Sequence, residues 1–227
     1  MILDYDDDIL ADTMIFDATP DTNYGSSPMM RTYKTTGEHI RSYVMFSLDN
    51  LTHISPNSIV TAKWYGYVYR VDGDVINAHI YGVNATWNEN RLLWGSQPCS
   101  TAENNPGNDN CNGTASDSLT NLASGNWYSF DVLPALRKAL AEKKSDISFV
   151  ILANEDWLGD GAGQYYYTKE EKTNANLVHY LNVTYVPPTK AGFQLSSKMI
   201  YIIIIIFLLV IIRILLWYIN SLHKKVK

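Results

Sequence analysis

Cysteine is nearly absent from this chain. Its 227 residues contain only Cys99 and Cys111. They lie twelve positions apart in a stretch rich in turn residues, CSTAENNPGNDNC, where either a disulfide or two free thiols would fit. We expect the disulfide, and a disulfide would mark an oxidising compartment.

Recognisable catalytic motifs are also lacking. The five histidines are scattered, and no G-x-S-x-G, H-E-x-x-H or glycine-rich phosphate loop occurs. A glycosidase needs two carboxylates across a cleft, and nothing in the spacing of the many Asp and Glu residues singles out such a pair. We therefore expect no catalytic residues and a protein that is not an enzyme.

Acidic residues stop at Glu171, although the chain as a whole has a net charge of -5. Four of the 18 basic residues follow position 198, so residues 1–198 carry 14 basic and 23 acidic residues, a net charge of -9. Such an acidic domain repels a phosphate backbone. Nucleic acid is therefore not an expected partner.

The one long apolar run is 199–219, MIYIIIIIFLLVIIRILLWYI, which contains a single charge. A helix of this length would span about 31 Å and predicts a single transmembrane helix in a lipid bilayer. Tyr201 near one end and Trp217 and Tyr218 near the other fit the two membrane interfaces, and we expect Arg213 to extend toward the headgroups. Residues 187–198 would be a linker, and the basic tail 220–227 predicts an interior C-terminus.

Residues 1–8 form an acidic extension, whereas a secretory signal begins with basic residues followed by an apolar run. Either a leader has been removed, or the C-terminal span directs insertion, or the protein is tail-anchored with its domain in the cytosol. The cysteine pair favours an exposed domain, with weaker support from four Asn-x-Thr sequons. These begin at Asn50, Asn84, Asn112 and Asn182. We expect the domain on the exterior of a cell or a virion.

Strand-like segments fill residues 9–186, which include most of the 16 tyrosines. They are residues 42–48, 58–71, 75–83, 127–132, 147–153 and 177–186. One amphipathic helix is expected over 131–144, with Asp131 as its N-cap and Pro134 in its first turn. The pattern predicts a mainly β domain, an antiparallel β-sandwich with one short helix.

The order of several segments resembles the DNRLRE domain family. The matching segments are ADT at 11–13, PDTNYGSS at 20–27, RSYVMFSL at 41–48, WNENRLLWGSQP at 87–98, WYSFDV at 127–132, YTKEE at 167–171 and LNVTY at 181–185. The chain departs from the family at Thr168-Lys169, where Ser-Arg is more frequent, and at Leu133, where Thr is usual. The resemblance implies a jelly-roll β-sandwich related to carbohydrate-binding modules, and a structural calcium.

Calcium prefers several oxygen ligands with carboxylate charge. Asp12, Asp21 and Asn23 match the opening segment of the family, and Asp131 could share their site. The loop 154–160 and the acidic group Asp4, Asp6, Asp7 and Asp8 are two other oxygen-rich segments. Turn formation and capping are the alternative explanation for the loop positions, and a solvated tail is the alternative for the acidic group.

Glycan contact requires exposed aromatic rings with polar groups nearby. On the segment 58–71, alternation places Tyr65, Tyr67 and Tyr69 on the face opposite Trp64, and Tyr165, Tyr166 and Tyr167 are further candidates. The same rings could pack across strands or against a neighbouring subunit. Trp87 and Trp94 are expected in the core instead.

Two functions remain open. In the first, a membrane-anchored surface protein recognises or adheres to a partner, with a cell-surface glycan as the candidate ligand. In the second, the chain is a structural subunit of a surface assembly or of a membrane-containing virion, with homo- or hetero-oligomeric neighbours.

Overall fold

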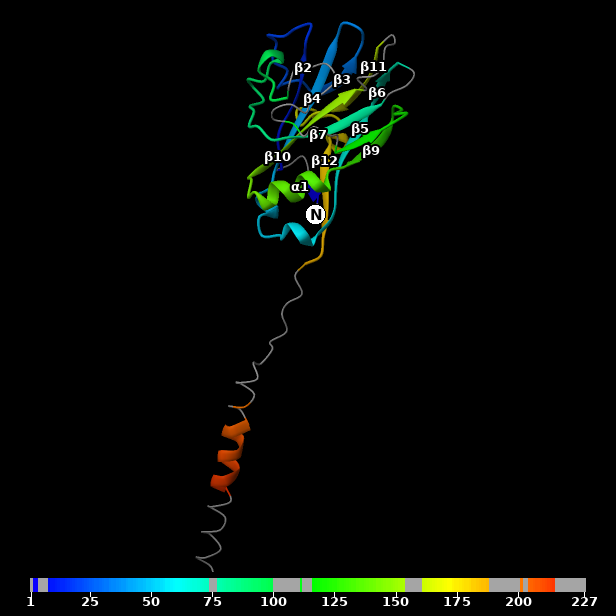
Figure 1. The fold of residues 1–227 in the computed structure, drawn as a ribbon. Helices are drawn as coiled ribbons and strands as arrows, with labels where there is room; N and C mark the ends of the chain where they lie inside the picture. Colours follow the sequence, from blue (N-terminus) through cyan, green and yellow to red (C-terminus); the bar gives the residue numbers. More distant parts are fainter. Residues whose placement is uncertain are drawn as a thin grey trace, which may run out of the picture. The chain divides into compact units, whose positions relative to one another are not determined.

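The computed structural model describes residues 2–3, 8–73, 77–99, 111, 116–153, 161–187, 201 and 204–214. The chain divides into two compact units, Met1–Pro187 and Pro188–Lys227. The first unit holds two antiparallel β-sheets and one α-helix (Figure 1).

The smaller sheet has four strands. Their spatial order is β1 (Ile2–Leu3), β12 (Tyr180–Tyr185), β5 (Ile59–Val68) and β9 (Asn126–Asp131). In the central strand β5, Tyr65 lies opposite Tyr180 of β12 and Ser129 of β9. This register brings the side chains of three strands distant in sequence onto one surface.

The larger sheet has eight strands. Seven follow in the order β6 (Arg70–Asp72), β11 (Ala162–Tyr167), β3 (Met29–Lys34), β4 (His39–Ser47), β10 (Asp146–Ala153), β7 (Ala78–Val83) and β8 (Asp117–Leu119), and β2 (Ile9–Phe16) pairs with β4. The central strands β4 and β10 are buried along nearly their whole length.

The main hydrophobic core contains side chains from both sheets. Its largest fully buried members include Trp64, Phe130, Tyr166, Phe46 and Phe149. Apolar residues alternate along the strands because one face of each sheet packs against the other sheet. The expectation of a mainly β, sandwich-like domain is confirmed.

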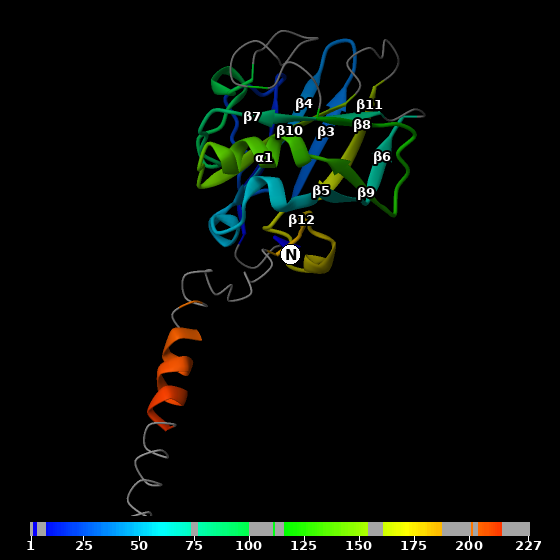
Figure 2. The same ribbon diagram turned by 60° about the horizontal axis from the view of Figure 1, so that its bottom comes forward.

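The predicted helix is present as α1 (Leu133–Ala141), with Pro134 in its first turn. Ala135, Leu136 and Ala139 are buried against the main core. Asp131 accepts a hydrogen bond from the Leu133 amide at 2.9 Å, although the N-cap position itself is Val132. The helix contacts β5 and β10 (Figure 2). Four 3-10 turns complete the elements: Asp49–Leu51, Pro56–Ser58, Trp94–Ser96 and Ala175–Leu177.

A second hydrophobic cluster lies on the opposite face of the larger sheet. On β10, Phe149 and Ile151 point into the main core, whereas Val150 and Leu152 belong to this second cluster. The segment after β7 covers it, with Leu92 buried and both Trp87 and Trp94 partly buried. The predicted disulfide between Cys99 and Cys111 is confirmed, and both cysteines are buried in this cover.

The segment 58–71 is not the single strand that its alternation predicts. β5 ends at Val68, and the amide of Tyr69 donates to the carbonyl of Tyr165 at 3.2 Å, in the other sheet. Arg70–Asp72 then pairs with β11 as β6. The chain changes sheets at Tyr69, so Tyr69 does not share a surface with Tyr65 and Tyr67.

In the second unit, the described residues are Tyr201 and 204–214, which are helical and exposed. Arg213 belongs to this helix, and Trp217 and Tyr218 lie outside the described residues. Within the part of the chain that the structure describes, no helix combines the length and the apolar character needed to span a membrane.

Candidate functional site

Four aromatic rings lie together on the outer face of the smaller sheet. On β5, Trp64, Gly66 and Val68 are buried, so the intervening Tyr65 and Tyr67 face outward. Trp127 of β9 lies opposite Tyr67, and Tyr180 of β12 lies opposite Tyr65. We call Tyr65, Tyr67, Trp127 and Tyr180 the small-sheet aromatic surface.

The rings support one another. Tyr65 and Tyr180 are stacked, with their centroids 4.9 Å apart and their planes at 8°. The indole of Trp127 lies 5.5 Å from the ring of Tyr67 and 5.3 Å from that of Tyr180, at 63° and 60° to them. Trp127 is 38% exposed. Its ring is therefore held by its neighbours and remains available to a ligand.

Polar side chains continue this face along the strands. Lys63 lies opposite Asn182 on one side and Asp131 on the other, and Ser129 lies opposite Tyr65. A cation, an anion, an amide and a hydroxyl are thus next to the rings. Such a surface can stack the apolar face of a sugar and hydrogen-bond its hydroxyl groups.

The other tyrosines predicted for contact lie in the larger sheet. Tyr165 and Tyr167 lie on the face of β11 opposite Tyr166. Tyr165 is nevertheless only 9% exposed, and Tyr167 is partly buried, with Tyr69 stacked on it at a centroid distance of 4.4 Å. Burial, followed by the nearby Tyr167 and Tyr165, raises the pKa of Tyr69 to about 12. Tyr166 points the other way, is fully buried and packs on Trp64, which removes it from any surface.

Tyr165 is surrounded by charged groups. The guanidinium groups of Arg31 and Arg70 each lie 4.9 Å from its ring centroid, and its hydroxyl donates to Asp72 at 2.8 Å. Both arginines also pair with Asp72 at 3.0 Å. Burial would raise the pKa of Asp72, but these hydrogen bonds and charges lower it. Asp72 therefore compensates much of the positive charge on this face.

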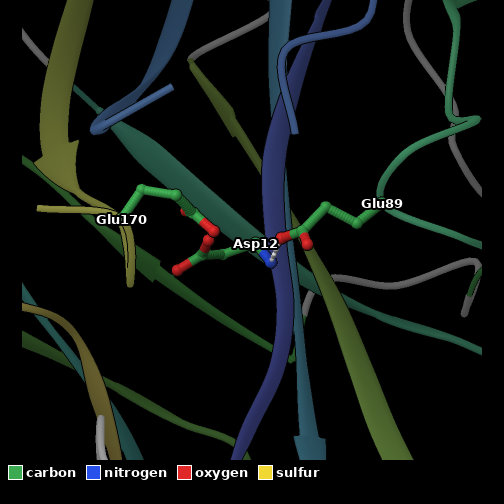
Figure 3. A group of neighbouring side chains, drawn as sticks. All are labelled: Asp12, Glu89 and Glu170. Atoms are coloured by element: carbon green, nitrogen blue, oxygen red, sulfur yellow. Dashed lines mark hydrogen bonds between the residues drawn. The ribbon is translucent and has the colours of Figure 1, made fainter. Parts of the chain in front are cut away.

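Three carboxylates converge at one edge of the sandwich: Asp12 on β2, Glu89 after β7 and Glu170 after β11. One oxygen from each lies within 4.8 Å of the other two. Figure 3 shows the carboxylate of Glu170 directed at that of Asp12, while Glu89 approaches from the opposite side, where its Oε1 accepts the Asp12 amide at 2.8 Å. We call these residues the acidic cluster.

Lys169 lies within the acidic cluster. Its ammonium group contacts Glu89, lies 3.0 Å from Glu170 Oε1 and lies 3.7 Å from Asp12 Oδ1. Its backbone amide also donates to Asp12 Oδ2 at 2.8 Å. This ammonium takes the role that a bound cation would have among three carboxylates.

A buried polar chain extends from Asp12 into the core. His179 Nε2 lies 2.8 Å from Asp12 Oδ2, and the indole nitrogen of Trp64 donates to His179 Nδ1 at 3.3 Å. Because an indole N–H only donates, His179 Nδ1 must accept, which leaves the proton of a neutral ring on Nε2 facing Asp12. The chain joins β2, β12 and β5 through side chains.

The charges shift the pKa values of this group in opposite directions. Burial would raise the pKa of Asp12, but the hydrogen bond with His179 and the charge and backbone amide of Lys169 lower it. Burial and the charge of Asp12 raise the pKa of Glu170. Burial would lower the pKa of Lys169, and its contact with Glu89 outweighs this and raises it. One ammonium group is thus shared by three carboxylates, and the incomplete compensation of their charge is seen in the raised pKa of Glu170.

The four residues predicted for calcium do not converge. Asp21 is exposed, and Asn23 uses its amide group on the carbonyls of Glu89 and Leu92. Asp131 lies on the smaller sheet and Asp12 on the larger one, and the carboxylates grouped around Asp12 among the described residues are Glu89 and Glu170. These residues do not fit a common ion. Asp4, Asp6, Asp7 and the loop 154–160 lie outside the described residues, and the Asp8 carboxylate accepts from Asn50 at 3.0 Å.

The four sequons differ in their surroundings. The amide of Asn50 is bound to Asp8, Asn84 is exposed and has interactions of its own, and Asn112 lies outside the described residues. Asn182 is half-buried on the outer face of β12, and its side chain has no hydrogen bond to any residue that the structure describes.

The sequence analysis did not identify two rings of the aromatic surface, Trp127 and Tyr180. It also did not identify the residues around Asp12, which are Glu89, Lys169, Glu170 and His179. Alternation along 126–131 and 180–185 could have placed the two rings, because Phe130 and Leu181 mark the buried parity. No local signal marks the acidic cluster, whose members are 77 to 158 positions from Asp12.

Comparison with known proteins gives one result about the domain. No curated protein matches the chain. The model of carbohydrate-binding module family 96 matches residues 8–183, which include α1, all four residues of the small-sheet aromatic surface and the strands of both sheets apart from β1 and the last two residues of β12. The chain therefore belongs to carbohydrate-binding module family 96.

Proposed function

We propose that this protein is a non-enzymatic recognition protein that binds carbohydrate on the small-sheet aromatic surface. Families of carbohydrate-binding modules are generally non-catalytic, and membership of one fits glycan recognition. The observation that carries the location is Trp127, an exposed indole held by Tyr67 and Tyr180. Lys63, Asn182 and Asp131 lie farther along the same face of the sheet.

The physical argument concerns the two faces of a sugar. The C–H face of a pyranose packs on an aromatic ring, and its equatorial hydroxyl groups bond to nearby amides and charged groups. Ring pairs are worth about 0.5–1.5 kcal/mol beyond area burial, so a few such contacts give modest affinity per site. The open sheet face accepts the middle of a glycan chain as readily as its end.

Binding of the full-length chain in detergent to a glycan array tests this location. We expect Trp127→Ala to abolish binding and Tyr67→Ala to weaken it, because each removes part of the supported ring surface. Tyr69→Ala is the matched control, since Tyr69 is stacked on Tyr167 in the other sheet. Loss of binding in the control alone would move the site to the larger sheet and overturn the assignment.

The apolar segment 199–219 supports membrane attachment as part of the proposal. The described helix 204–214 exposes Ile204, Ile205, Ile206, Phe207 and the apolar residues that follow them. Together with the basic tail, this run supports a domain outside a cell or virion and an interior C-terminus. Protease treatment of intact membranes or particles tests it: the domain should be digested and the tail protected, and the reverse pattern would contradict it.

A structural role in a surface assembly or a membrane-containing virion is the second candidate. Val60, near the start of β5, and Val186, just after β12, are both exposed. The Val186 amide donates to the Ser58 carbonyl there. Exposed apolar residues on the sheet that also carries the aromatic surface suit contact with a neighbouring subunit. Loss of assembly in Trp127→Ala, with no glycan bound by the unaltered chain, would favour this candidate.

A further inference from the structure

The outer face of β12 places a sequon in line with the aromatic surface. The segment reads Tyr180-Leu181-Asn182-Val183-Thr184, and burial alternates so that Leu181 and Val183 point into the core. Tyr180, Asn182 and Thr184 therefore share the outer face. The acceptor asparagine is two residues from an aromatic ring on the same side of the same strand.

We propose that Asn182 is an N-glycosylation site and that the first sugar of its glycan packs on Tyr180. Residues i and i+2 of a strand are about 6.7 Å apart. An N-acetylglucosamine on the Asn182 amide can therefore fold back so that its C–H face covers the ring. Tyr65 stacks on Tyr180 at 4.9 Å and fixes the ring that would receive the sugar.

The surroundings of Asn182 distinguish it from the other sequons. Its amide makes no hydrogen bond to the described residues, so attaching a sugar breaks none there. The Asn50 amide, by contrast, donates to Asp8 at 3.0 Å, and a sugar would disturb that bond. Asn84 also has interactions of its own. No aromatic residue stands two positions before Asn50, Asn84 or Asn112.

A glycan on Asn182 would change what the aromatic surface can bind. Tyr180 also contacts Trp127, with centroids 5.3 Å apart, so a sugar attached to Asn182 would cover part of the surface that the proposed function needs. The modified chain should therefore bind an external glycan more weakly. This consequence rests on the proposed function, whereas the modification itself does not.

The test begins with site occupancy. The full-length chain, placed behind a secretory leader, is expressed in a eukaryotic cell line, and occupancy of each sequon is measured by peptide mass spectrometry. We expect Asn182 to be modified. An unmodified Asn182 overturns the proposal, whatever the state of the other three sequons.

Stability then tests the contact with Tyr180. Trimming the glycan to a single N-acetylglucosamine should preserve the melting temperature, and removing that last sugar should lower it by about 2–4 °C, the shift that about 1 kcal/mol gives in a domain of this size. Enzymatic removal converts the asparagine to aspartate, so Asn182→Asp is the matched unmodified control. The last sugar should make no difference in Tyr180→Leu. An equal shift in that variant overturns the stacking.

Glycan-array binding separates the two proposals. If Asn182 is occupied and neither the modified nor the unmodified chain binds any glycan, the proposed function fails and the modification site stands. If the unmodified chain binds and the modified chain binds equally well, the attached sugar does not cover the surface, and the proposed contact is wrong.

Discussion

The ammonium group of Lys169 lies 3.7 Å from Oδ1 of Asp12, a carboxylate that is fully buried. Lys169 also contacts Glu89 and Glu170, so a single ammonium group is shared by carboxylates from three chain segments. Its backbone amide binds the same aspartate. Lys169 and Asp12 thereby tie the segment after β11 to β2.

Replacing Lys169 should be strongly destabilising. In Lys169→Met, Asp12 and its two acidic neighbours lose their counter-ion, and breaking a buried ion pair costs about 3–5 kcal/mol. Urea unfolding at neutral pH measures this free energy. Lys172→Met, at an exposed lysine nearby, is the control and should change little. Equal effects of the two substitutions would show that the network contributes nothing specific.

Glu170→Gln should stabilise the domain at neutral pH. The pKa of Glu170 is raised in the folded state, so the folded state binds its proton more tightly than the unfolded chain does. The stabilising contribution of Glu170 to the free energy of unfolding is therefore fully present below its unfolded pKa of about 4.3. It is lost as the pH rises through the folded pKa. Measured from pH 4 to 8, the free energy of unfolding of the variant should increase relative to that of the unaltered protein as the pH rises.

Glu171→Gln is the control of opposite sign for that experiment. The amides of Asn174 and Thr173 donate to the Glu171 carboxylate at 2.9 and 2.7 Å, and they lower its pKa. Its contribution is present above the unfolded pKa and is lost as the pH falls through the folded pKa. A parallel pH dependence for the two variants would contradict the assignment of both shifts.

Gly66→Ala should destabilise the main core. A Cβ at position 66 would overlap the ring of Trp64 and lie 2.8 Å from Cε1 of Tyr166, both buried. Overpacking of this kind costs about 1–3 kcal/mol, which chemical unfolding can measure. Gly37→Ala has open space around the added methyl and should leave the unfolding midpoint unchanged. An unchanged midpoint in Gly66→Ala would mean that the two rings can move apart.

Removing both cysteines should lower stability, because the disulfide joins two cysteines that are buried in the second hydrophobic cluster. For a loop of this size the expected loss is about 2–4 kcal/mol. The double variant Cys99→Ala, Cys111→Ala should therefore unfold at a lower urea concentration than the oxidised protein. Reduction of the unaltered protein should produce a similar shift, and no shift in either case would contradict a stabilising role.

Alternation in the sequence was enough to find β4, β5, β7, β9, β10 and β12 and the inward side of β5, but not β2, β3, β8 or β11. Trp64 and Val68 are buried as their parity predicts, and α1 begins beside Asp131 and Pro134 as expected. The pairing of Cys99 with Cys111 was equally accessible, since no other cysteine exists. The strands depend on local periodicity, and the disulfide could form within the chain only between its two cysteines.

The sequence by itself thus determined which faces are apolar, which cysteines pair and where the long apolar run lies. Only the tertiary structure decided that Tyr69 belongs to a different sheet from Tyr67, that Trp127 and Tyr180 complete the aromatic surface, and that Lys169 is the shared counter-ion of the acidic cluster. The physical reason is that strand pairing and buried ion pairs join residues far apart in the chain, where local periodicity carries no information about register or partners.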